Sequence, residues 1–282
     1  MVENRPIARL LAHLFLIIAV IVVAFPVYYT FVASTQETQP IATGNVSLLP
    51  QGHILENYRQ ALSAGVSRTS GQPVARMMFN SLVVALVVAV GKIVISLLSA
   101  YAVVFFRFPL RMLFFWMIFI TLMLPVEVRI LPTYKVVSDL GMLDSFAGLT
   151  IPLIASATAT LLFRQFFLTI PDELVEAAKI DGAGPLRFFR DMVIPLSRTN
   201  IAALFVILFI FGWNQYLWPL LITNSDSMET IIIGIKRMMG GADAQTEWGE
   251  VLATTMLAML PPVAVVIFMQ RWFVKGLVDS EK

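Results

Sequence analysis

Apolar residues occupy six long stretches of this chain, separated by shorter polar segments. A helix rises about 1.5 Å per residue, so about 20 apolar residues cross a hydrocarbon core about 30 Å thick. Each stretch is long enough to do so, and the pattern predicts six transmembrane helices in one all-α membrane domain over residues 1–282. The predicted spans are 10–33, 77–106, 112–131, 146–168, 201–223 and 251–273.

The orientation of the spans follows from their charged flanks. The first stretch is longer than the core of a secretory signal and has no clear cleavage site after it, so we interpret it as a span. Positive loops stay in the cytoplasm. With a cytoplasmic N-terminus, seven of the 20 lysines and arginines lie outside and both termini lie inside. The inside set is Arg5, Arg9, Arg107, Arg111, Arg164, Lys179, Arg187, Arg190, Arg198, Arg271, Lys275 and Lys282.

Composition excludes several functional classes. A chain that is 58% hydrophobic and 13% charged is not an ordinary water-soluble domain. It has no cysteine and only two histidines, which lie in different segments, so no metal site is predicted. The net charge of +2 is accounted for by inside loops facing anionic lipid, and no nucleic-acid partner is predicted. No phosphate loop of the G-x-x-x-x-G-K-[ST] type is present, so energy must come from another chain or from an ion gradient.

The inside loop at 169–200 is the most specific polar segment. Pro171 and the two acidic residues after it favour a helix start, and Gly182 favours a stop. Pro185 opens a second short helix that Pro195 is predicted to end. The residues alone leave two interpretations open: a knob that docks into a partner, or a capped amphipathic loop lying on the bilayer.

Within this loop, Glu176-Ala177-Ala178 is followed by Gly182 and then by Met192-Val193-Ile194-Pro195. This order resembles the E-A-A-x-x-x-G-x(9)-I-x-L-P loop of permease subunits in binding-protein-dependent ABC importers. Met192 and Ile194 are conservative apolar exchanges within that motif. The resemblance covers the whole chain, including the Trp213-Asn214 pair, and is strongest to the carbohydrate (maltose-type) branch.

The resemblance implies a transport subunit that is not an enzyme and forms half of a pore in a bacterial inner membrane. Its expected partners are a homologous second permease, a cytoplasmic ATPase dimer that binds the ATP and magnesium, and a periplasmic solute-binding protein. The loop would be a coupling helix that fits a groove of the ATPase. The implied coupling residues are Glu176, Ala177, Ala178, Asp181, Gly182, Ile194 and Pro195.

Segments 107–130, 212–222 and 276–282 resemble the members of this branch that import sn-glycerol 3-phosphate. The expected solute is therefore this ester or a related glycerophosphodiester, with an uncharged sugar as the alternative. Two other classes stay open: a secondary transporter driven by an ion gradient, and a purely structural membrane subunit.

Polar side chains at membrane depth are costly and often face a solute pathway. Lys92 lies in the middle of the second predicted span. The alternative to a position on the solute pathway is that its amine faces inward and bonds to carbonyl groups or to a neighbouring subunit. Proline residues flank the LPVEVRILP segment, which is either part of a broken span or a helix end at the outer interface. The predicted pathway residues are Lys92, Glu127, Arg129, Asn214, Gln215 and Tyr216, with Asn214 more architectural than selective.

Overall fold

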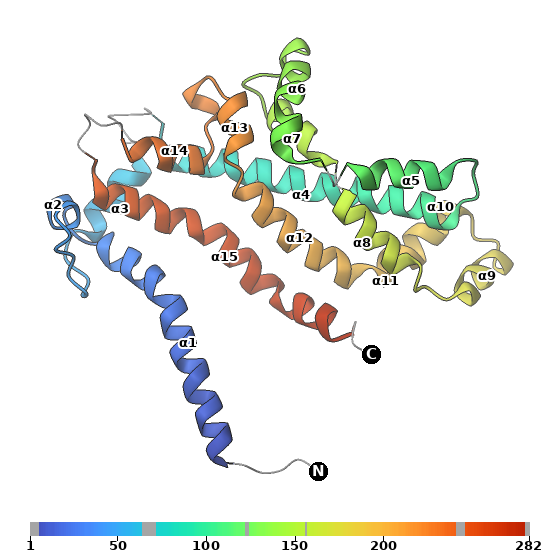
Figure 1. The fold of residues 1–282 in the computed structure, drawn as a ribbon, viewed down its shortest axis with the longest axis horizontal. Helices are drawn as coiled ribbons and strands as arrows, with labels where there is room; N and C mark the ends of the chain where they lie inside the picture. The colour runs from blue at the N-terminus through green and yellow to red at the C-terminus, as the bar shows by residue number, and fades with distance from the viewer. Residues whose placement is uncertain (1–5, 64–71, 122–123, 156, 241–245, 280–282) are drawn as a thin grey trace. The chain divides into compact units, whose positions relative to one another are not determined.

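The computed structural model describes residues 6–63, 72–121, 124–155, 157–240 and 246–279. Every regular element in these ranges is helical, which confirms the all-α prediction (Figure 1). The chain divides into two compact units. The first is Met1–Ala75 with Gly234–Met259, and the second is Arg76–Ile233 with Leu260–Lys282.

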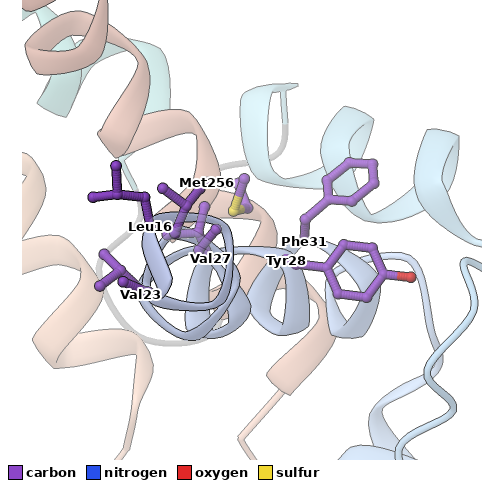
Figure 2. Close-up of a pocket in the computed structure, with 9 residues that line it drawn as sticks. Leu16, Val23, Val27, Tyr28, Phe31 and Met256 are labelled. Carbon is purple, nitrogen blue, oxygen red and sulfur yellow. The ribbon is translucent and has the colours of Figure 1, made fainter. Parts of the chain in front are cut away.

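The first unit contains the N-terminal helix α1, Pro6–Ala33, whose described side chains are apolar and exposed over most of its length. Such a surface needs a hydrocarbon environment, because water would have to solvate an apolar helix on every face. Apolar side chains of α1 form an open groove of about 810 Å³ together with Met256 of α15 (Figure 2). The labelled lining residues are Leu16, Val23, Val27, Tyr28 and Phe31.

A buried polar turn follows α1. Gln36 is fully buried, and its Nε2 donates a hydrogen bond of 2.8 Å to the Ser47 carbonyl. Asn57 Nδ2 donates to the carbonyls of Ser34 and Gln36, at 2.9 Å each. These bonds satisfy carbonyls of the turn itself, while Thr35 Oγ1 donates a 2.7 Å hydrogen bond to the Val32 carbonyl, one of the groups that the end of α1 leaves open. The short helices of this region are α2, Thr38–Ala42, and α3, Ile54–Ser63.

The second unit is organised around α4, Val74–Phe105, a continuous helix of 32 residues and about 48 Å. Helix α12, Arg198–Trp213, packs beside it (Figure 1). A Cβ added to Gly212 would lie 2.9 Å from the Ala85 Cα, so only a glycine permits this approach. Small residues allow the backbones of membrane helices to come this close.

The third predicted span is not one helix. Helix α5, Arg111–Ile120, ends before Pro125, and α6, Val126–Asp139, begins after it. A proline lacks the N–H of the helical ladder and disfavours helical geometry in the residue before it, which explains the break. The break falls in the LPVEVRILP segment, where the sequence pattern predicts either a broken span or a helix end.

The fifth predicted span is also interrupted. Helix α12 ends at Trp213 and α13, Leu217–Ile222, starts after a short polar segment. Pro219 lies in the first turn of α13, where its missing N–H has no helical partner to lose. The remaining helices of this unit are α7, Phe146–Ile154; α8, Ala157–Phe167; α9, Asp172–Ile180; α10, Pro185–Phe188; and α11, Ile194–Leu196.

A buried apolar cluster joins α4, α6, α7 and α13. Trp218 lies in this cluster, and its Nε1 donates a 3.0 Å hydrogen bond to the Gly148 carbonyl. Close by, Asp144 Oδ1 accepts from the backbone of Asn224 at 2.6 Å and from that of Ser225 at 2.8 Å. Partial burial opposes ionisation of Asp144, but these donors outweigh it and hold the pKa of the carboxyl below its usual value.

Helix α14, Ile231–Met238, and helix α15, Trp248–Asp279, complete the described chain. Three helices, α1, α4 and α15, are long and apolar enough to cross a membrane. Two bent pairs raise this number to five: α7 with α8, bent by 43°, and 185–196 with α12, bent by 71°. The described structure thus supports three to five of the predicted spans.

Candidate coupling loop and polar cavity

Helix α9 ends in a turn that its sequence specifies. Gly182 has a φ of +68°, in the left-handed region that glycine tolerates best. Its N–H donates to the Lys179 carbonyl at 3.1 Å, and the Ala183 N–H donates to the Ala178 carbonyl at 2.9 Å. This pair of bonds is the Schellman arrangement. The helix start near Pro171 and the stop at Gly182 agree with the sequence prediction.

The surface of α9 is open to solvent in this single chain. Glu176, Ala177, Asp181 and Gly182 are all exposed, whereas Ala178 is half-buried. Two large apolar side chains extend the same loop: Ile180 is 86% exposed and Leu186 is 82% exposed. The motif did not point to these two residues. Exposed aliphatic side chains beside small residues are typical of a surface that another protein covers.

In the second half of the loop the helix starts at Pro185 and is broken before Arg198, as predicted, but Pro195 lies inside its last turn. The chain passes from α10 through a π-helical turn, Phe189–Val193, into α11, so Pro195 does not end the helix. The wider turn accommodates the missing N–H of this proline. The direction changes instead near Ser197, whose Oγ donates to the Val193 carbonyl at 2.6 Å. Ile194 and Pro195 are half-buried here and not part of the exposed surface.

The π-helical turn carries an exposed ion pair. Asp191 Oδ1 lies 2.7 Å from Arg190 Nε, and Asp191 Oδ2 lies 3.6 Å from Arg187 Nε. The hydrogen bond from Arg190 holds the pKa of Asp191 below its usual value. Exposed pairs of this kind contribute little to stability, so we assign the turn no further role.

The C-terminal end of α4 forms a seat for the loop. Tyr101 Oη donates a 2.8 Å hydrogen bond to the Pro185 carbonyl. The Tyr101 ring centroid lies 4.7 Å from that of Phe189 and 6.4 Å from that of Phe188. A cavity of about 280 Å³, lined in part by Tyr101 and Ala178, separates this seat from α9. No sequence pattern pointed to Tyr101, because an aromatic residue in a span usually indicates packing.

A second cavity, of about 180 Å³, lies farther along α4. Its polar lining residues come from separate elements: Lys92 from α4, Arg129 and Thr133 from α6, and Gln215 from the segment between α12 and α13. Phe211, Leu217 and Trp218 belong to its apolar wall. The structure therefore brings together three of the residues predicted to face a solute pathway.

The other predicted pathway residues are placed differently. Asn214 follows the last residue of α12 and is exposed, and Tyr216 is 37% exposed; neither lines this cavity. The backbone of Glu127 belongs to α6, but its side chain lies outside the described part of the structure. Thr133 and Phe211 line the cavity and were not predicted to do so.

The two sites offer binding surfaces. Among the described residues, no group of three His, Cys, Asp or Glu side chains is arranged to hold a metal ion. The cavity instead presents two cationic side chains, an amide and a hydroxyl, which can bind a small polar solute. The loop presents an exposed helix with small residues, which can fit a protein groove.

Comparisons with known proteins show which family the chain resembles. Residues 92–279 match the model of the family described as "Binding-protein-dependent transport system inner membrane component". Proteins named "sn-glycerol-3-phosphate transport system permease protein UgpE" are similar over the full length of both chains. The identity is 67% for Agrobacterium fabrum, 66% for Rhizobium meliloti and 57% for Yersinia enterocolitica.

One solved structure shares the fold. It belongs to a bacterial ABC transporter involved in the import of the acidic polysaccharide alginate, and it matches with a TM-score of 0.82 and 21% identity. The match covers 97% of this chain and 99% of the other. The family resemblance inferred from the E-A-A loop is thus confirmed: the chain belongs to the binding-protein-dependent transport system inner membrane components.

Proposed function

We propose that this chain is a permease subunit of an ATP-driven importer for sn-glycerol 3-phosphate and related glycerophosphodiesters. The observation that carries the proposal is the 57–67% identity to full-length relatives named as permeases of that solute. Membership of the family makes the chain an inner-membrane transport component and not an enzyme. The polar cavity supports an anionic solute, because two of its lining side chains are cationic.

The proposed assembly divides the work among several chains. A homologous second permease would complete the pore, and a periplasmic binding protein would deliver the solute. A cytoplasmic ATPase dimer would bind ATP and magnesium and receive the loop at Glu176, Ala177 and Gly182. The exposure of α9 supports this contact, since a helix inserted into a partner must be accessible in the isolated chain.

The proposed topology has six spans and cytoplasmic termini. Beyond the three long helices and the two bent pairs, the sixth crossing would combine α5 with the start of α6. The break at Pro125 is compatible with a crossing, because irregular backbone is tolerated at membrane depth where it lines a protein cavity. Arg129 and Thr133 of the polar cavity follow this break.

Uptake into proteoliposomes tests the proposed function. The liposomes contain this chain, the second permease, the ATPase and the binding protein, with ATP on the ATPase side. We expect labelled sn-glycerol 3-phosphate to accumulate only with ATP, and an excess of maltose to leave its rate unchanged. Accumulation of a sugar in its place would refute the solute, and accumulation driven by an ion gradient without ATP would refute the importer.

Tyr101→Phe is expected to weaken coupling in the same assay. The change keeps the ring against Phe188 and Phe189 but removes the hydroxyl that bonds to the Pro185 carbonyl. One such bond contributes about 0.5–1.5 kcal/mol, which corresponds to roughly a 2- to 12-fold loss of uptake per ATP hydrolysed. Tyr58→Phe, in the first unit, is the control. An unchanged ratio of uptake to ATP hydrolysis for Tyr101→Phe would show that the hydroxyl has no part in coupling.

A further inference from the structure

The polar cavity combines a small volume with an unusual set of charges. Its volume of about 180 Å³ is below the range of about 300–1,000 Å³ that is typical of sites for drug-sized ligands. Such a space suits a small solute or one polar group of a larger solute. Two of its lining side chains, Lys92 and Arg129, carry positive charge.

Lys92 is the buried member of this pair. Its side chain belongs to the core of the second unit, and the residue is only 8% exposed. The ammonium group lies 3.9 Å from the centroid of the Phe211 ring and makes a cation–π contact with it. An ammonium group at membrane depth needs more than one aromatic face, since it has three N–H donors to satisfy.

Arg129 approaches the same space from α6. Its backbone carbonyl accepts a 2.7 Å hydrogen bond from Thr133 Oγ1, which ties these two lining residues together. Within the described residues, no carboxylate forms an ion pair with Arg129 or with Lys92. Two cations beside one small cavity repel each other, and an anion bound between them turns this repulsion into attraction.

Gln215 adds a neutral group to the site. Its Nε2 donates to the Phe211 carbonyl at 3.1 Å, which orients the amide and leaves its oxygen able to accept a hydrogen bond. The cavity therefore offers cationic donors for phosphate oxygens and an acceptor for a hydroxyl. An uncharged sugar would accept hydrogen bonds from the two cations but would leave their charges uncompensated.

We propose that Lys92 and Arg129 together bind the phosphoryl group of the solute during its passage, with Gln215 beside its glycerol hydroxyls. This inference rests on the proposed function, because it assumes that the solute is a phosphate ester. It assigns a transient anion site to this permease chain itself, in addition to the site on the binding protein. Arg129 contributes a planar fork that matches phosphate oxygens, and Lys92 contributes a point charge.

Charge-removing and charge-retaining variants test the site in the reconstituted importer. Lys92→Met and Arg129→Gln are expected to lower the rate of sn-glycerol 3-phosphate uptake at saturating loaded binding protein by about tenfold or more. Stimulation of the ATPase by the loaded binding protein is expected to persist, because the coupling loop is unchanged. Lys92→Arg and Arg129→Lys are expected to retain a substantial part of the uptake.

The matched control is Lys135→Met on α6, whose ammonium is exposed and lies 3.1 Å from Asp139 Oδ2. It is expected to transport as the unmodified chain does. If Lys92→Met does not assemble, the exposed Arg129 decides the test through Arg129→Gln. Normal uptake by the charge-removing variants would overturn the anion site. So would a loss of uptake in the charge-retaining variants as large as in the charge-removing ones. Either result would leave the proposed solute unaffected. Absence of uptake by the unmodified importer would instead refute the proposed function.

Discussion

Gly182→Val is expected to abolish ATP-dependent uptake in the reconstituted importer. The residue has a φ of +68°, and the turn that ends α9 depends on it. A non-glycine residue in left-handed geometry costs about 1–2 kcal/mol, and a β-branched residue costs more. The turn would relax, and the exposed face of α9 would lose its orientation toward the ATPase. We expect uptake to fall at least about tenfold while the ATPase alone keeps its basal hydrolysis.

Gly184→Val is the matched control for this change. A Cβ at either glycine would meet nothing within 4 Å, so crowding is equal at the two positions. Gly184 has a φ of −68° and a ψ of 165°, an extended geometry that valine adopts readily. Uptake by the Gly184 variant is expected to stay within about a factor of two of the unmodified protein. Equal losses in both variants would show that backbone conformation at Gly182 is not the cause.

Gly148→Ala is expected to destabilise the second unit more than any other glycine-to-alanine change in the described chain. The new Cβ would overlap the Met142 carbonyl oxygen and lie 3.3 Å from Ile222 Cγ2. Relief requires α7 to move, which disturbs the hydrogen bond from Trp218 Nε1 to the Gly148 carbonyl. Overpacking of this kind costs about 1–3 kcal/mol or more.

Thermal unfolding in detergent, followed by tryptophan fluorescence, measures this effect. We expect the midpoint to fall by roughly 5 °C or more for Gly148→Ala. Gly52→Ala is the control, because a Cβ there meets nothing within 4 Å and φ is not positive. A midpoint for Gly148→Ala equal to that of the control would contradict the close approach of α7 to Met142.

Local sequence signals predicted the helices well where hydropathy alone decides their extent. The first two apolar runs correspond to α1 and α4, and Pro26 inside α1 does not end that helix. The third run was predicted to be broken or to end within the LPVEVRILP segment, and α5 and α6 are separated there at Pro125. The interruption of the fifth run between α12 and α13 was not predicted, because hydropathy averages over a window and does not register a short polar segment.

The coupling loop was largely predictable, and the polar cavity was not. Pro171 and Gly182 act on their own backbone, so the bounds of α9 follow from local chemistry. Lys92, Arg129 and Gln215 come from three separate segments, and no spacing rule relates them. Phe211 and Tyr101 were missed for a similar reason: an aromatic side chain gains a role only from the group that tertiary packing places beside it.

The continuity of α4 has a mechanical consequence. Near one end Asn80 Nδ2 donates to the carbonyls of Ser227 and Glu229, at 2.9 Å each, and near the other Tyr101 holds the coupling loop. Lys92 lies between them, nine residues and about 13 Å before Tyr101 on an unbroken helix. A helix resists twisting because its hydrogen bonds would break. A rotation imposed on the C-terminal end of α4 would therefore turn Lys92 through nearly the same angle and move its ammonium group along an arc.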